Sequence, residues 1–99
     1  MIVETTHYYA LPGRVDAVLE QRRRATDVRI KLGLLPGRIL RKLEGAGPDI
    51  RWECSFETRA DYDADMAVRA ASAEFATARQ AMHTLIERFE RHLHEHVVD

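Results

Sequence analysis

The stretch DIRWECSFET, residues 49–58, alternates apolar and polar side chains with a period of two. Such alternation is typical of a β-strand with one face buried against a core. The apolar face holds Ile50, Trp52, Cys54 and Phe56, and the polar face holds Arg51, Glu53, Ser55 and Glu57. We therefore expect the central strand of a small sheet, with helices on its apolar face and a second compartment on its polar face.

Two further strands are predicted before this stretch. Residues 2–10 are rich in β-branched and aromatic types, and the Leu-Pro-Gly sequence at 11–13 ends that strand. Residues 38–44 form the other strand, and the loop Gly-Ala-Gly-Pro at 45–48 joins it to the central strand. So short a connection predicts that these two strands pair as an antiparallel hairpin.

Helices are predicted on either side of the hairpin. The first covers residues 14–32, and Gly33 is suited to the position just after its last turn. The second covers the alanine-rich residues 60–71, with Thr58 as its N-cap. Ser72 then restarts a helix, because a serine with an acidic residue in the following turn is a typical helix start.

Three consecutive arginines, residues 22–24, lie within the first helix. The apolar stripe of this helix thins after Leu19 toward Arg22 and Arg29, so periodicity leaves its buried arc open. We interpret the arginine run as a solvated helical face paired with Glu20 and Asp27, because the net charge of the chain is balanced.

The last quarter of the chain permits two structures. A helical stripe of apolar residues runs from Phe75 to Ile86. Beyond it, Phe89, Leu93 and Val97 suit a continued helix and equally one face of an edge strand. Periodicity alone leaves both alternatives open for residues 87–97, and we predict a short closing strand there.

The predicted order is β-α-β-β-α with a last strand, which is the ferredoxin-like plan of an α+β domain. The right-handed crossover rule places both crossover helices on one face of the antiparallel sheet. The other face would then carry uncovered side chains, so we expect a second copy of the chain to cover it. Residues 1–99 are expected to form a single domain of a homodimer.

The composition limits the classes of partner. Fifteen Lys and Arg balance 16 Asp and Glu for a net charge of −1, so general affinity for nucleic acid is not expected. No apolar run approaches the roughly 20 residues of a membrane span, and the first residues lack the pattern of a signal peptide. We therefore expect a cytoplasmic protein without membrane contact. The single cysteine, Cys54, is expected to be a small buried side chain.

Several short motifs resemble one known family. They are Glu4 and Tyr8 ahead of LPGR at 11–14, FET at 56–58, ASAEF at 71–75 and IERFERHL at 86–93. Together they resemble the NIPSNAP family, within the dimeric α+β-barrel superfamily that also holds the antibiotic-biosynthesis monooxygenases. The resemblance implies a ferredoxin-like subunit, a dimeric barrel and a closing strand at the C-terminal end. It also implies chemistry like that of cofactor-independent monooxygenases, so no cofactor is expected.

Six residues are the candidates for a ligand site. Glu4 and Tyr8 share a strand face and lie roughly 13 Å apart along it. Arg51 and Glu53 are charged residues on the polar face of the central strand. If that face lines the interior of a dimeric barrel, they must be paired, because unpaired buried charge is costly. His7 is a possible general base, since its pKa lies near neutral pH. The candidate set is Glu4, His7, Tyr8, Arg51, Trp52 and Glu53.

No metal site is expected. His92, His94 and His96 invite a metal interpretation, but we interpret them as part of a solvated terminal segment. Two functions remain in competition: a barrel that binds, or acts on, a small apolar or aromatic molecule, and a non-enzymatic structural or protein-interaction dimer. RNA binding ranks below both, because acidic residues accompany the basic ones.

Overall fold

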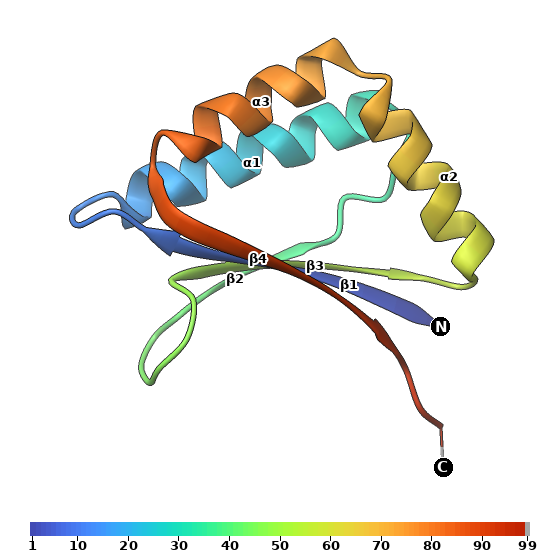
Figure 1. Ribbon diagram of the computed structural model, residues 1–99, viewed down its shortest axis with the longest axis horizontal. Coiled ribbons are helices and arrows are strands. Elements are labelled where there is room, and N and C mark those ends of the chain that lie inside the picture. The colour runs from blue at the N-terminus through green and yellow to red at the C-terminus, as the bar shows by residue number, and fades with distance from the viewer. Residues whose placement is uncertain (99) are drawn as a thin grey trace.

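The computed structural model describes residues 1–98, and in them a four-stranded antiparallel sheet carries three helices on one face (Figure 1). The elements are β1 (Ile2–Ala10), α1 (Val15–Lys31), β2 (Arg38–Arg41), β3 (Ile50–Phe56), α2 (Arg59–Ala70), α3 (Ala73–His83) and β4 (Ile86–Glu95). The strand order is β2-β3-β1-β4. This is the predicted ferredoxin-like α+β fold.

The closing strand resolves the alternative that periodicity left open. Residues 86–95 form β4, which pairs antiparallel with β1 along its length, so the helix ends at His83. The predicted hairpin of β2 and β3 is also present, with Arg38 opposite Glu53 and Arg41 opposite Ile50. The strand β2 is shorter than predicted and ends at Arg41 rather than at residue 44.

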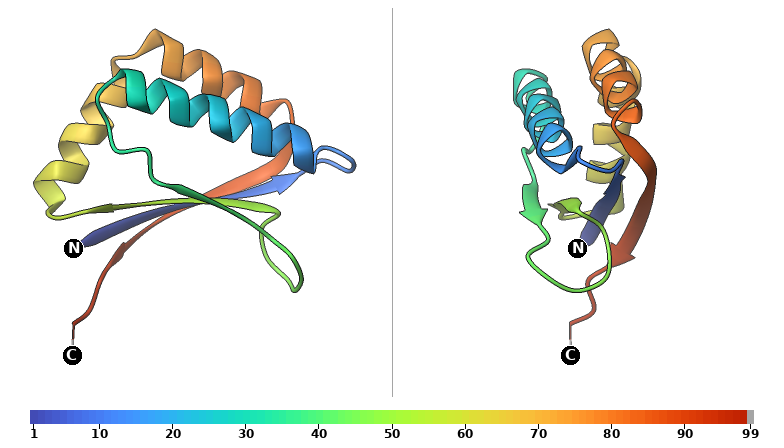
Figure 2. Two further views of the ribbon diagram at one scale, coloured as in Figure 1. Left: turned by 180° about the vertical axis from the view of Figure 1, so that it is seen from behind. Right: turned by 90° about the vertical axis from the view of Figure 1, so that its left-hand side faces the viewer.

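The helices and the sheet form two layers, with all three helices on the same side (Figure 2). The apolar face of β3 lies between the layers, and its four side chains are at most 4% exposed. The side chains packed around them include Val18 of α1, Tyr62 of α2 and Met82 of α3. The predicted apolar face of the central strand is therefore confirmed as the core.

Local signals in the sequence fix the helix ends. The hydroxyl of Thr58 accepts a hydrogen bond from the backbone N–H of Asp61 at 3.1 Å, and that of Ser72 accepts one from Phe75 at 3.0 Å. Both are N-caps, which satisfy backbone donors at the start of a helix. Gly33 follows the C-cap of α1 with a φ of +77°, a conformation that suits glycine.

Trp52 is fixed by a close approach of the chain. Its Nε1 donates a hydrogen bond to the carbonyl of Pro36 at 3.0 Å. A Cβ on Gly37 would lie 2.5 Å from that nitrogen, and the φ of Gly37 is +68°. Only glycine fits there, and it allows the segment before β2 to hold the indole ring in the core.

The interpretation of the arginine run was wrong for its first member. Arg24 is exposed and pairs with Glu20, as expected. Arg22, however, is 5% exposed and lies between α1 and the sheet. The helical period explains this: Arg22 follows Val18 by four residues and precedes Ala25 by three, so all three share the buried face.

In the described part of the chain, no helix is long and apolar enough to cross a membrane.

Candidate functional site

A cavity of about 90 Å³ lies between the helices and the sheet. Its volume exceeds several-fold the roughly 10–15 Å³ that one water molecule needs. The strands contribute Glu4, Thr6, Tyr8, Trp52 and Arg91, α1 contributes Arg22, Ala25 and Arg29, and α2 and α3 contribute Arg69, Phe75, Ala78, Arg79, Met82 and His83. The exposed side chains Arg79, His83 and Arg91 form its rim, between α3 and β4.

Two buried carboxylates and two buried guanidinium groups form a cluster at the cavity; we call them the quartet (Glu4, Arg29, Asp65 and Arg69). Glu4, Arg29 and Arg69 line the cavity, and Asp65 contacts both guanidinium groups. Arg69 donates two hydrogen bonds to the two oxygens of Glu4, at 2.8 and 3.1 Å. Arg29 donates two to Asp65, also at 2.8 and 3.1 Å. An ion pair of 2.8 Å between Arg69 Nε and Asp65 Oδ1 joins the two pairs. The quartet is therefore balanced in charge.

Burial and the charges of the quartet shift the pKa values of Arg69, one of its members, and of the neighbouring Cys54. Burial alone would lower the pKa of Arg69, but the hydrogen bonds and charge of Glu4, with the charge of Asp65, raise that pKa above its usual value. Burial also raises the pKa of the Cys54 thiol, while the Arg29 guanidinium partly offsets this. Cys54 is buried, as predicted from the sequence.

Arg22 is a third buried guanidinium, and no carboxylate within the described residues pairs with it. Its Nη1 donates one hydrogen bond to the Tyr8 hydroxyl, at 3.2 Å. Its Nε and Nη2 are buried without a hydrogen-bond partner among residues 1–98. The guanidinium carbon lies 4.8 Å from the centre of the Trp52 ring, at a cation–π distance. Arg22 is thus an uncompensated positive charge on the cavity wall.

The cavity as a whole carries an excess of positive charge. Five arginines line it, and the only carboxylates in or beneath its described wall are Glu4 and Asp65. The whole chain has a net charge of −1, so this excess is local. A cleft with such a charge distribution attracts anions.

The six candidates predicted from the sequence divide between the two faces of the sheet. Glu4, Tyr8 and Trp52 face the helices and line the cavity. The register pairs Glu4 with Cys54 and Tyr8 with Ile50, and directly paired residues share a face. Arg51 and Glu53 alternate with these core residues and lie on the opposite, open face. The six candidates therefore do not line a single cavity.

Ion pairs organise the open face. The Glu53 side chain, 12% exposed, lies between Arg38 and Arg51 and forms an ion pair with each. His7 is directly opposite Arg51 in the register and lies 3.8 Å from a carboxylate oxygen of Glu90. Burial lowers the pKa of His7, and the positive charges of Arg51 and His92 lower it further, while Glu90 acts in the other direction.

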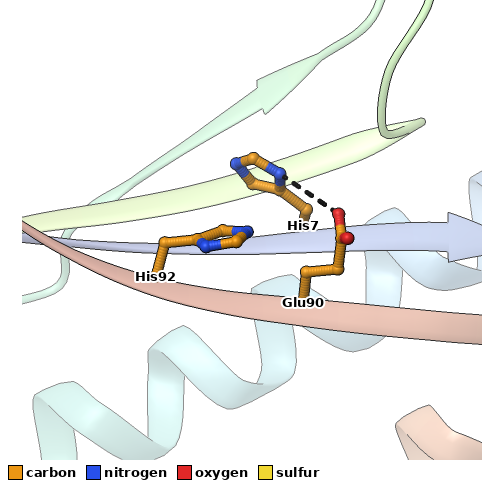
Figure 3. Close-up of side chains that lie close together, drawn as sticks. All are labelled: His7, Glu90 and His92. Carbon is orange, nitrogen blue, oxygen red and sulfur yellow. Dashed lines mark ion pairs between the residues drawn. The ribbon is translucent and has the colours of Figure 1, made fainter.

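One cluster on the open face has donors suitable for a metal ion. His7, Glu90 and His92 each offer a ligand atom, and these atoms lie within 4.8 Å of one another. Figure 3 shows the three side chains projecting together from β1 and β4. His92 is exposed, as expected of a solvated segment, and lies beside His7 and Glu90.

Sequence reasoning missed the charged residues that matter most here: Arg22, Arg29, Asp65, Arg69 and Glu90. The signal for Arg22 and Arg29 was present, because both continue the apolar stripe of α1. Asp65 and Arg69 follow the buried Tyr62 on the same helical face of α2. A charged side chain at a core position is expensive unless it is paired. A charged side chain at a core position of a helix therefore indicates a buried polar site in which that charge is paired.

Solved structures with a similar fold exist. A NIPSNAP domain protein of Burkholderia xenovorans matches with a TM-score of 0.79 and 14% identity over 98% of this chain and 95% of that one. A Nitrosomonas europaea protein, described as a candidate antibiotic biosynthesis monooxygenase, matches with a TM-score of 0.71 and 18% identity over 99% and 100%. A dimeric protein of Bacteroides fragilis, described as having a ferredoxin-like fold, matches with a TM-score of 0.70 and 12% identity over 96% and 95%.

No protein-family model matches the sequence, and no curated protein does. At identities below 20% the three structural matches establish the fold and nothing finer. The resemblance predicted from the short motifs is confirmed at that level: this chain has the ferredoxin-like fold seen in NIPSNAP and monooxygenase-type proteins.

Proposed function

We propose that this protein binds a small molecule with an acidic group and an apolar or aromatic body, in the cavity between the helices and the sheet. The observation that carries the proposal is Arg22, whose buried Nε and Nη2 lack a hydrogen-bond partner within residues 1–98. A desolvated guanidinium costs several kcal/mol unless an anion pairs with it. A carboxylate fits best, because it accepts two hydrogen bonds side by side from one guanidinium.

Other side chains of the cavity would contact the apolar or aromatic body of the ligand. Trp52, Phe75, Ala78 and Met82 offer apolar surface. Ligand pockets typically combine such a lining with a few polar groups that fix orientation. The quartet cannot serve as the anion site, because its two guanidinium groups are already engaged by carboxylates. Arg22 is thus the group to which we assign the acid, with Arg79 and Arg91 at the rim attracting it.

The oxygenase description belongs to the structural neighbours; for this chain we propose binding. A cytoplasmic location, the absence of a cofactor and the absence of nucleic-acid binding stay predictions from the sequence.

The proposal is tested by a thermal-shift series in which each acid is compared with its neutral amide: acetate with acetamide, benzoate with benzamide, and phenylacetate with phenylacetamide. We expect at least one acid to raise Tm by roughly 10 °C at 100 times its Kd, because binding to the native state stabilises it by mass action. The matching amide should give less than a fifth of that shift. If no acid raises Tm more than its amide does, the proposal is wrong.

We further propose that a second copy of this chain covers the open face of the sheet. The support is the row formed by Arg38, Arg51 and Glu53, in which Glu53 is already largely shielded from water. The Bacteroides fragilis neighbour, which is described as dimeric, adds support from the fold. Sedimentation at micromolar concentration should give twice the 11.4 kDa of one chain. A species of 11.4 kDa alone would contradict the dimer.

Glu53→Ala is expected to weaken this dimer at least tenfold. In a single chain, Glu53→Ala should lower the free energy of unfolding by only about 1 kcal/mol, because Arg38 and Arg51 remain solvated on one side. In the dimer both arginines would be buried without their carboxylate, which is far more costly. Glu57→Ala is the matched control, since Glu57 is exposed beyond the end of β3. Equal dissociation constants for the two variants would mean that the open face is not the interface.

A further inference from the structure

The cluster of His7, Glu90 and His92 combines two imidazoles and one carboxylate on the open face of the sheet (Figure 3). These are the donor types that bind zinc and its neighbours among the divalent transition metals. We propose that the three side chains form a binding site for one such ion, separate from the cavity under the helices.

The backbone holds the three donors in place. In the antiparallel pairing of β1 with β4, His7 is directly opposite Glu90, and Thr5 is opposite His92. Glu90 and His92 are two residues apart on one strand, so both lie on the face of His7. His7 Nδ1 is 3.8 Å from Glu90 Oε1, whereas two donors of a tetrahedral zinc ion lie roughly 3.4 Å apart. The three donor atoms lie within 4.8 Å of one another, so the side chains must rotate to bring all of them to one ion.

Groups around the cluster complete the arrangement. The Tyr9 hydroxyl donates a hydrogen bond to Glu90 Oε1 at 2.9 Å, which orients the carboxylate. Such outer contacts are typical of metal-binding carboxylates and histidines. Nε2 of His7 is buried and has no hydrogen-bond partner among residues 1–98. The ion would bind Nδ1, the ring nitrogen nearer to Glu90, and Nε2 would then carry the ring proton.

The charges facing the cluster permit a cation. Two arginines lie near the cluster: Arg51, opposite His7 on β3, and Arg88, whose guanidinium carbon is 3.9 Å from the centre of the Tyr9 ring. The Arg51 guanidinium lies 3.3 Å from Glu53, which also pairs with Arg38, so the charge of Arg51 is compensated in part. His94 is a further histidine on the same strand, with its ring centre 6.1 Å from that of His92. The ion would thus tie the edge strand β4 to β1.

The test is a titration of the full chain, without an affinity tag, with Zn²⁺ by calorimetry and with Co²⁺ by visible absorption. We expect saturation at one ion per chain. His92→Gln and Glu90→Gln should each weaken binding at least tenfold, and both should fold, because His92 is exposed and glutamine keeps the shape of Glu90. Tyr9→Phe should weaken binding by a smaller factor, since Tyr9 only positions a ligand.

The controls distinguish this cluster from the other histidines. His83→Gln and His96→Gln should bind Zn²⁺ as the wild type does. Absence of saturable binding at one ion per chain would overturn the proposal. So would a result in which His94→Gln or His96→Gln abolishes binding while His7→Gln and Glu90→Gln retain it, because the ion would then belong to the terminal histidines.

Discussion

Replacing Asp65 with alanine is expected to lower the free energy of unfolding by about 3–5 kcal/mol, because removal of one partner leaves buried charge uncompensated. Asp65 is 5% exposed and contacts two guanidinium groups, those of Arg29 and Arg69. Arg29 is fully buried and would lose its only carboxylate among the described residues. Urea unfolding followed by circular dichroism measures the loss.

The matched control for this prediction lies two residues earlier on the same helix. Asp63 pairs with Arg59 at 3.2 Å, but both side chains are more than 60% exposed, so Asp63→Ala should cost less than about 1 kcal/mol. The double variant Arg29→Met/Asp65→Leu should be more stable than Asp65→Ala, since it removes the stranded charge together with its partner. A double variant less stable than the single one would contradict an electrostatic origin.

Arg22→Met is expected to weaken binding of the acid by about 100-fold, the loss typical of truncating one partner of a buried charge pair. The same substitution should change the stability of the unliganded chain by less than about 1 kcal/mol. Loss of the Tyr8 hydrogen bond and of the Trp52 contact is offset by removal of a desolvated charge. Calorimetric titration and urea unfolding of the same variant measure the two effects.

Arg24→Met is the control for Arg22. Arg24 lies on the same helix, but its side chain is 68% exposed and its ion pair with Glu20 is long, at 3.7 Å. We expect it to bind the acid as the wild type does. If Arg22→Met and Arg24→Met lose affinity for the acid equally, arginine charge acts only at long range. Arg22 would then not be the acid-binding group.

The fold followed from the sequence to a large extent. The alternation of residues 49–58 predicted β3 and its buried face, because a strand with one covered face must alternate. The crossover rule predicted that the helices lie on one side. Residues 87–97 were not decided by periodicity, since Phe89 and Leu93 suit both a helix and a strand. For these residues the family resemblance favoured a strand. The structure has that strand as β4, which pairs with β1.

The site followed much less well, for physical reasons. Strand alternation gives the two faces of β1 and of β3, but only the register tells which faces coincide. The pairing of Glu4 with Cys54 is what separates Glu4 from Glu53. Buried arginines are equally hard to foresee. Glu4 and Arg69 are 65 residues apart in the sequence, so their compensation appears only after folding.

The most direct test of the cavity proposal is the nuclear magnetic resonance signal of the Arg22 Nε–H group, assigned by its absence in Arg22→Met. The titrant is the acid that gives the largest thermal shift, with its amide as the reference. We predict that the Arg22 signal moves and saturates with the acid and stays in place with the amide. An Arg22 signal that does not move while the acid binds, or that moves equally with the amide, would contradict Arg22 as the acid-binding group.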